Sequence, residues 1–205
     1  MIKRTIKILL IIFSILILGI FYLSIFGIKT DRFNNKIIKN ISKIDKRINL
    51  DLNEIRYLLN PYKFTINVKT KNPKILIEGR NLEIETIQTN VVLKSLINSQ
   101  FLIDDLQITT KEIKLNDVIE LAKIFQNSPK LFVLDTIIKE GSITANINLN
   151  FDENGKIKKN YKIKGSIKKA KLNILNQLKL QSLNFNFDID ENNYCDGLMH
   201  TTNIL

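Results

Sequence analysis

The chain has 205 residues, of which 44% are hydrophobic and 25% are charged, and its formal net charge is +11. This composition excludes a disordered tail and fits one domain of ordinary size together with a membrane segment. The lysines are scattered singly among Ile and Asn, whereas nucleic-acid-binding proteins cluster their charge and interleave it with stacking aromatics. We therefore expect no nucleic-acid partner, and interpret the lysines as a solvated surface with a general attraction to anionic lipid headgroups.

The N-terminal segment is predicted to be a membrane anchor. Residues 8–28 carry no charged side chain, and a helix of this length covers about 30 Å, the thickness of the hydrocarbon core of a bilayer. A cleaved signal peptide is the alternative, but its apolar core is usually shorter, and no small-x-small cleavage site follows this run. We therefore expect residues 1–30 to remain as a single transmembrane helix.

The charges that flank the apolar run indicate its orientation. Lys3, Arg4 and Lys7 precede the run and favour a cytoplasmic N-terminus, which places the rest of the chain across the membrane. Lys29, Arg32 and Lys36 follow it and weaken this signal. The charge pattern therefore favours this orientation without fixing it.

Residues 31–60 are predicted to form an amphipathic helical segment. One apolar stripe runs along it at spacings of three and four residues: Phe33, Ile37, Ile41, Ile44 and Ile48. Such a helix can lie in the membrane interface through its basic face, or it can pack on the sheet that follows. We favour packing, because five branched or aromatic side chains need to be buried.

From about Pro61 the apolar period changes from 3.6 to 2, which predicts strands. Strands are expected at residues 63–69, 75–77, from 82 onward, in two short pieces within 99–115, and at 142–151, 157–167 and 182–189. Residues 91–99 are predicted as a short helix or helical turn, and Asp104 and Asp105 as a bend or bulge. A helix is expected from Asn116, its cap, to a point just before Pro129. Short local connections between strands favour an antiparallel meander.

The hairpin of residues 142–167 has the clearest two-faced pattern, with its apolar residues at odd positions. Asn154 and Gly155 suggest a two-residue turn, but that turn would pair Phe151 with Lys158 on the same side of the sheet. A three-residue loop, residues 153–155, instead gives the following pairs: Phe151–Ile157, Ile147–Tyr161 and Ala145–Ile163. We predict this second register.

Side chains that carry chemistry are scarce. The single histidine, His200, and the single cysteine, Cys195, are too few for a zinc site, and one cysteine excludes an intrachain disulfide. No glycine-rich phosphate loop is present. The acidic residues at 104–105 and 188–191 are interpreted as turn residues that satisfy their own backbone. The sequence therefore predicts no catalytic residue, no metal, no cofactor and no enzymatic activity.

The order of these parts resembles a known family. Residues 93–115, LKSLINSQFLIDDLQITTKEIKL, resemble the short helix and paired strands near the start of the AsmA-like envelope proteins. This group includes AsmA, YhdP and TamB and is related to the chorein-type lipid-transfer proteins. Residues 151–172, FDENGKIKKNYKIKGSIKKAKL, resemble the hairpins of the same proteins. The likeness is one of pattern and arrangement, and it covers nearly the whole chain.

This resemblance implies a protein anchored in the inner membrane, with the bulk of the chain in the periplasm. It implies a long curved sheet whose concave face is an apolar trough, with membrane phospholipids as partners and other envelope proteins as further candidates. The implied role is phospholipid transfer between membranes or outer-membrane assembly. Family members are usually much longer, so the chain is expected to be an N-terminal fragment or one member of a split system.

The expected fold class is mainly β with helices: a transmembrane helix, then a curved antiparallel β-meander with an open groove and two or three short helices. We expect an anchor at 1–30, the helical segment at 31–60, and a β-groove domain at 61–205 that is incomplete at its C-terminus. The predicted lipid-groove residues are Phe64, Ile66, Val68, Ile75, Ile77, Phe101, Ile103, Ile143, Ala145, Ile147, Leu149, Phe151, Ile163, Phe185 and Phe187. The alternative is a membrane-tethered structural or adaptor domain in which the same residues close into a dry core.

Overall fold

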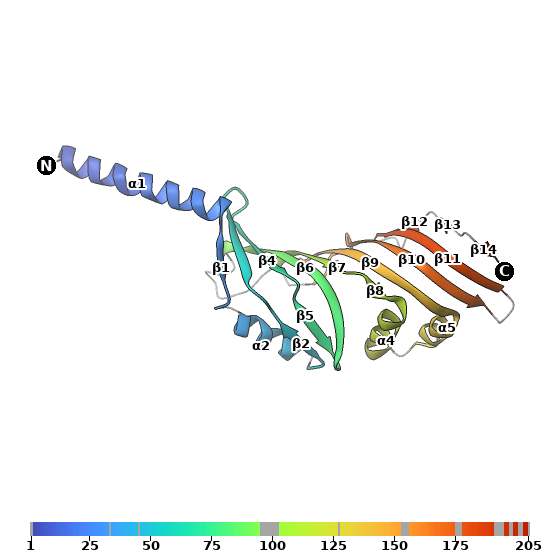
Figure 1. The fold of residues 1–205 in the computed structure, drawn as a ribbon. Coiled ribbons are helices and arrows are strands. Elements are labelled where there is room, and N and C mark those ends of the chain that lie inside the picture. The colour runs from blue at the N-terminus through green and yellow to red at the C-terminus, as the bar shows by residue number, and fades with distance from the viewer. Residues whose placement is uncertain are drawn as a thin grey trace.

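The computed structural model describes residues 2–32, 34–44, 46–94, 103–126, 128–152, 156–174, 178–190, 195–196, 199–200 and 203–204. In these ranges the chain forms four helices and fourteen strands, and an open antiparallel sheet makes up most of the structure (Figure 1). Helix α1 extends away from the sheet, which is curved, and α2, α4 and α5 lie on one side of it (Figure 1). The predicted fold class is confirmed.

The bounds of the elements are as follows. The helices are α1 (Ile2–Ile25), α2 (Asn34–Ile44), α4 (Leu115–Phe125) and α5 (Pro129–Ile137). The strands before α4 are β1 (Ile28–Thr30), β2 (Ile48–Asp51), β3 (Ile55–Asn60), β4 (Thr65–Lys71), β5 (Lys74–Ile77), β6 (Arg80–Val92), β7 (Ile103–Thr110) and β8 (Ile113–Lys114). The strands after α5 are β9 (Ile138–Asn150), β10 (Lys162–Ile174), β11 (Leu178–Ile189), β12 (Cys195–Asp196), β13 (Met199–His200) and β14 (Asn203–Ile204).

Strands that are close in the sequence are mostly neighbours in the sheet. The order is β1-β3-β4-β6-β7-β9-β10-β11-β12, and β13 and β14 also pair with β11. β2 and β5 form a side arm, because β5 pairs with β2 and with residues 80–83 of β6. Residues 86–92 of β6 pair with β4 in the main sheet. The strand pairs are antiparallel, so the predicted meander is confirmed, and β6 belongs to both the arm and the main sheet.

The helical segment is shorter than predicted. α2 ends at Ile44, and the later part of the segment predicted as helix contains β2 and β3 instead. The stripe misleads because Ile44 and Ile48 are four residues apart, a spacing that suits one face of a helix and one face of a strand equally. The preferred packing is confirmed, since Ile37 and Ile38 pack against a buried cluster of the sheet that includes Ile55.

Two helices follow β8 where one was predicted. The N-cap position of α4 is Lys114, which makes no side-chain capping bond, so the prediction that Asn116 is the cap is wrong. Asn116 lies inside the helix and donates from Nδ2 to the carbonyl of Ile138, 3.5 Å away. Pro129 lies beyond the end of α4, as predicted, and also starts α5 after Ser128, because the fixed φ of proline suits the first turn of a helix.

A β-bulge lies where Asp104 and Asp105 were predicted to interrupt the alternation. Across to β6, Asp105 pairs with Asn90 and Ile103 with Val91, so Asp104 is the extra residue of β7. The bulge reverses the phase of the side chains along the strand. The prediction is confirmed.

The hairpin of β9 and β10 keeps the predicted faces but only part of the predicted register. Phe151 pairs with Ile157, as predicted. The other two predicted pairs are wrong, and the structure has these instead: Ile147–Ile163 and Ala145–Gly165. Between the pairs Phe151–Ile157 and Asn148–Lys162, the first strand has two residues (149–150) and the second has four (158–161). In this irregular stretch Asn150 Nδ2 donates a hydrogen bond to Asn160 O at 3.2 Å. Because the slip is even, odd-numbered residues still face one another.

Two predictions fall partly outside the described residues. Of the helical turn predicted at residues 91–99, residues 91–92 end β6 and residues 93–94 are helical, whereas the rest is not described. The predicted three-residue loop, residues 153–155, is likewise not described.

Candidate functional site on the apolar face of the sheet

The strand register places one isoleucine directly beside the next across the middle of the sheet. The pairs join five neighbouring strands, β6, β7, β9, β10 and β11: Ile87–Ile108, Ile108–Ile147, Ile147–Ile163 and Ile163–Ile189. We call these five residues the isoleucine row. Strands lie about 4.8 Å apart, so the row is roughly 19 Å long and runs perpendicular to the strands. Toward α1 it continues through Thr70, Ile55 and Thr30.

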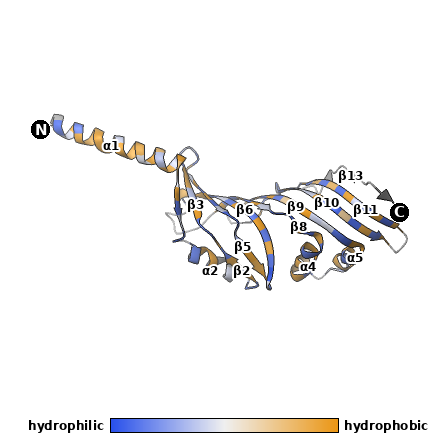
Figure 2. Ribbon diagram, viewed as in Figure 1, coloured by the Kyte–Doolittle hydropathy of each residue, from blue (hydrophilic) through white to orange (hydrophobic). Residues whose placement is uncertain are grey.

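Further apolar rows flank the isoleucine row on the same side, because residues two positions along a strand share its face. The flanking pairs are Val68–Thr89, Thr89–Leu106 and Leu106–Leu149 on one side, and Ala145–Gly165, Gly165–Phe187, Ile143–Ile167 and Ile167–Phe185 on the other. We call this side of the main sheet the apolar face. The alternation of hydrophobic and hydrophilic residues along the strands can be followed in Figure 2.

The reverse face of the sheet is polar. Directly behind the isoleucine row, the register joins Arg56, Lys69, Gln88, Gln107, Asn148 and Lys162. On the same face, Lys164 Nζ lies 2.9 Å from Asp188 Oδ2. This hydrogen bond holds the pKa of Asp188 below its usual value and raises the pKa of Lys164. Both side chains are well exposed, so the pair adds little to stability. The reverse face is therefore an ordinary solvated surface.

The structure places the predicted groove residues unequally. Twelve are half-buried: Ile66, Val68, Ile75, Ile103, Ile143, Ala145, Ile147, Leu149, Phe151, Ile163, Phe185 and Phe187. Ile75 and Ile77 belong to the side arm rather than the apolar face, and Ile77 is buried there opposite Ile48. Phe64 is 71% exposed in the turn before β4, where its φ of +50° takes it out of the strand. Phe101 lies outside the described residues.

Sequence reasoning missed part of the isoleucine row. Ile87, Ile108 and Ile189 were not among the predicted groove residues, although each pairs directly with a neighbouring isoleucine. The register of β6 and β7 shifts between Ile84 and Thr86, so Ile87 does not follow the alternation that Ile84 begins. Pairing with Thr70 of β4 and Ile108 of β7 shows which face Ile87 occupies.

Helices cover two parts of the apolar face, and the isoleucine row lies outside both. Near α1, α2 packs on a cluster that includes Ile55 and Tyr57. Beside the row, over other parts of β9, β10 and β11, Leu115 of α4 packs with Ala170 and Leu183, and Ile143 and Ile167 pack against them. All five residues of the isoleucine row are half-buried, and in the described part of the chain neither buried cluster includes any of them.

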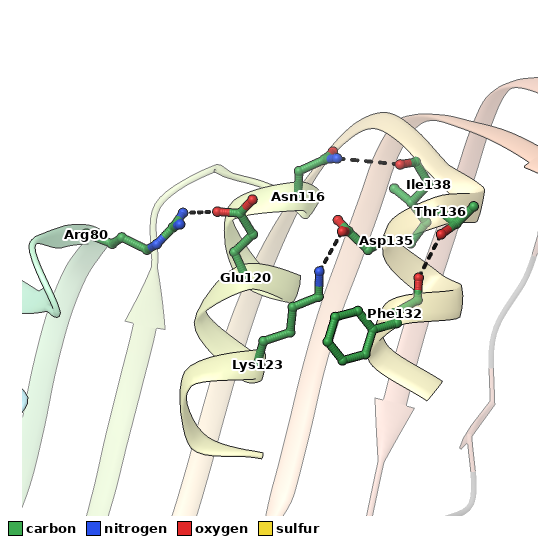
Figure 3. A network of polar contacts seen from close by, with 8 residues as sticks. All are labelled: Arg80, Asn116, Glu120, Lys123, Phe132, Asp135, Thr136 and Ile138. Carbon is green, nitrogen blue, oxygen red and sulfur yellow. Dashed lines mark hydrogen bonds and ion pairs between the residues drawn. The ribbon is translucent and has the colours of Figure 1, made fainter. Parts of the chain in front are cut away.

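Polar contacts fix α4 and α5 under the sheet (Figure 3). Arg80 at the start of β6 forms an ion pair with Glu120 of α4. Lys123 of α4 lies 2.5 Å from Asp135 of α5 and 4.8 Å from the centre of the Phe132 ring. These contacts join α4 to α5 and to the side arm, so the two helices are held as one unit against β9 and β10.

Phe187 lies across a glycine on the apolar face. A Cβ on Gly165 would come within 2.4 Å of both the Phe187 ring and the Thr144 carbonyl. The absence of a side chain at Gly165 therefore lets the Phe187 ring pack closely against the strand. We expect Gly165→Ala to lower the free energy of unfolding by about 1–3 kcal/mol, as overpacking does, measured by denaturant unfolding in detergent. The double variant with Phe187→Leu should recover part of this loss, and strict additivity would contradict the explanation.

A second structured site joins α1 to the sheet. Helix residues Arg4–Ile25 are long and apolar enough to cross a membrane, and none of this stretch is buried. Gly27 follows the helix with a φ of +66°, as a C-terminal glycine does. Arg56 of β3 donates from Nε and Nη2 to the carbonyl of Phe26, at 3.2 and 3.0 Å. The guanidinium thus satisfies a helix-end carbonyl and complements the helix dipole. The first strands are therefore fixed directly to the end of α1.

Within the described residues, no three His, Cys, Asp or Glu side chains gather as metal ligands would. Comparisons of the chain with models of protein families, with curated proteins and with solved structures give no match. The functional assignment therefore depends on the geometry of the apolar face and of the junction with α1.

Proposed function

We propose that the chain is a single-pass inner-membrane protein of the AsmA-like kind, with its sheet in the periplasm. Its apolar face holds the acyl chains of phospholipids and serves their transfer between membranes or the assembly of the envelope. The observation that carries the proposal is the isoleucine row, which is continuous across five strands, half-buried and outside both helix-covered clusters.

Physical chemistry relates this geometry to lipid movement. Apolar contact is non-directional and depends mainly on the area removed from water. An acyl chain can therefore shift from one isoleucine to the next without losing a specific bond at each step. The row runs perpendicular to the strands and away from α1, so movement along it leads away from the anchored end of the sheet.

A membrane-tethered adaptor domain is the second candidate. The two buried clusters favour it, because α2 and α4 already cover part of the apolar face with protein. In this case the isoleucine row is the binding surface for another polypeptide, and lipid does not reach it.

Site-specific photocrosslinking in cells separates the two candidates. We expect a photoreactive amino acid in place of Ile147 to form adducts with phospholipid. The same amino acid in place of Asn148, which is exposed on the reverse face, should form few or none. Adducts at position 147 that contain only protein would reject lipid binding and support the adaptor.

A further inference from the structure

The two most exposed large apolar side chains of the described structure lie in one turn. Residues 61–64 form the turn that joins β3 to β4, and in it Tyr62 is 95% exposed and Phe64 is 71% exposed. The next is Leu9 of α1, at 67%. A turn in water does not gain by presenting two aromatic rings to the solvent, so their exposure needs a partner to explain it.

The backbone holds the turn in this conformation. Phe64 has a φ of +50°, which is uncommon for a bulky residue and is found where the surroundings impose it. Its carbonyl accepts a hydrogen bond from Leu93 N at 2.9 Å, and Lys63 N donates to Asn60 Oδ1 at 3.2 Å. The two rings are therefore presented by a fixed turn.

The turn faces the apolar helix across an open pocket of about 580 Å³. Ile17, Phe21 and Ile25 of α1 line one side of the pocket, and Pro61 and Tyr62 of the turn line the other. The loop between β3 and β4 lies beside the C-terminal end of α1 (Figure 1). Along the axis of α1, the turn therefore lies beside the last part of the helix.

If α1 crosses a bilayer, this C-terminal part of the helix lies where the hydrocarbon core meets the headgroup region. Ile17 precedes Ile25 by about 12 Å along the helix axis, so the pocket extends over the outer part of the hydrocarbon core. Tyr22 and Phe26, whose ring centres are 5.1 Å apart, mark the same end of α1. Tyrosine and other amphipathic aromatics are enriched at this depth.

We propose that residues 61–64 enter the leaflet in which α1 ends, and that the pocket holds a phospholipid of that leaflet. The wall from α1 contacts acyl chains, while the amides of Asn60 and Asn67, which also line the pocket, suit the ester groups. Lys63, between the two rings, lies with the headgroups. The inference rests on the membrane span proposed for α1 and is independent of lipid movement along the isoleucine row.

The test uses tryptophan fluorescence, because the chain has no native tryptophan. The variants Tyr62→Trp and Phe64→Trp are made in the full chain and reconstituted in phosphatidylcholine–phosphatidylglycerol vesicles that contain lipid brominated high on the acyl chain. Tyr22→Trp reports on α1. Phe132→Trp is the matched control, because Phe132 is 53% exposed but lies on α5, which contacts β9 and β10 and is far from α1 (Figure 1).

We expect Tyr62→Trp and Phe64→Trp to show a blue-shifted emission and a loss of intensity equal to that of Tyr22→Trp, with Phe132→Trp unquenched. Quenching of Tyr22→Trp alone would overturn the insertion of the turn and leave the anchor intact. Absence of quenching in Tyr22→Trp as well would overturn the membrane span and the inference together. Neither result depends on lipid adducts at position 147.

Discussion

The variant Ile147→Asp is expected to prevent lipid from reaching the strands beyond β9. Ile147 is the middle member of the isoleucine row and pairs with Ile108 and Ile163. A carboxylate there stays hydrated and opposes the passage of an acyl chain, at a cost of several kcal/mol if water is excluded. A photoreactive amino acid in place of Phe187, on β11, should then form at least about tenfold fewer lipid adducts, which corresponds to roughly 1.4 kcal/mol.

A graded series separates lost lipid contact from lost folding. Ile147→Val keeps an apolar branched side chain and should retain adducts at position 187, whereas Ile147→Thr should give an intermediate yield. Asn148→Asp places the same carboxylate on the reverse face and should have no effect. A photoreactive amino acid in place of Ile87, which lies nearer to α1 than Ile147 does, should still form lipid adducts in Ile147→Asp. Equal loss at positions 87 and 187 would contradict movement along the row.

The variant Gly27→Ala is expected to disrupt the junction between α1 and the sheet. Gly27 has a φ of +66°, and a left-handed conformation costs an alanine about 1–2 kcal/mol. A Cβ there would also lie 2.3 Å from the carbonyl of Tyr57, so β1 would have to move away from β3. Together with overpacking, we expect a loss of about 2–5 kcal/mol in the free energy of unfolding.

Gly19→Ala is the matched control for this prediction. Gly19 lies within α1, and an added Cβ would meet no heavy atom within 4 Å. Both variants are measured by thermal or denaturant unfolding of the detergent-solubilised chain, with proteolysis between α1 and β1 as a local readout. Equal stability of the two variants would show that the junction does not constrain the sheet.

The sequence was sufficient for the fold class because its two apolar periods are strong. The uncharged run of residues 8–28 and the alternation in residues 142–151 each specify one type of element. The bulge at Asp104 was also predictable, because two acidic residues interrupt the alternation there. By contrast, the end of α2 was not predictable, because Ile44 and Ile48 suit a helix and a strand equally.

The candidate site depended on register more than on composition. Choosing odd-numbered residues in β9 and β10 was enough to find Ile147 and Ile163. It was not enough to find Ile87, because the shift near Ile84 reverses the phase of β6. The role of Arg56 at the end of α1 required a contact between residues about thirty positions apart in the chain, which no local pattern encodes.

The near-sequential order of the strands also bears on how the chain folds. In the main sheet, β3 pairs with β4, β9 with β10 and β10 with β11, so most pairings close short loops. Short loops lose little chain entropy on closure, and local pairings speed folding. A chain that emerges N-terminus first can therefore add each new strand to one that is already paired. The sheet can grow outward from α1, with one unpaired edge at a time.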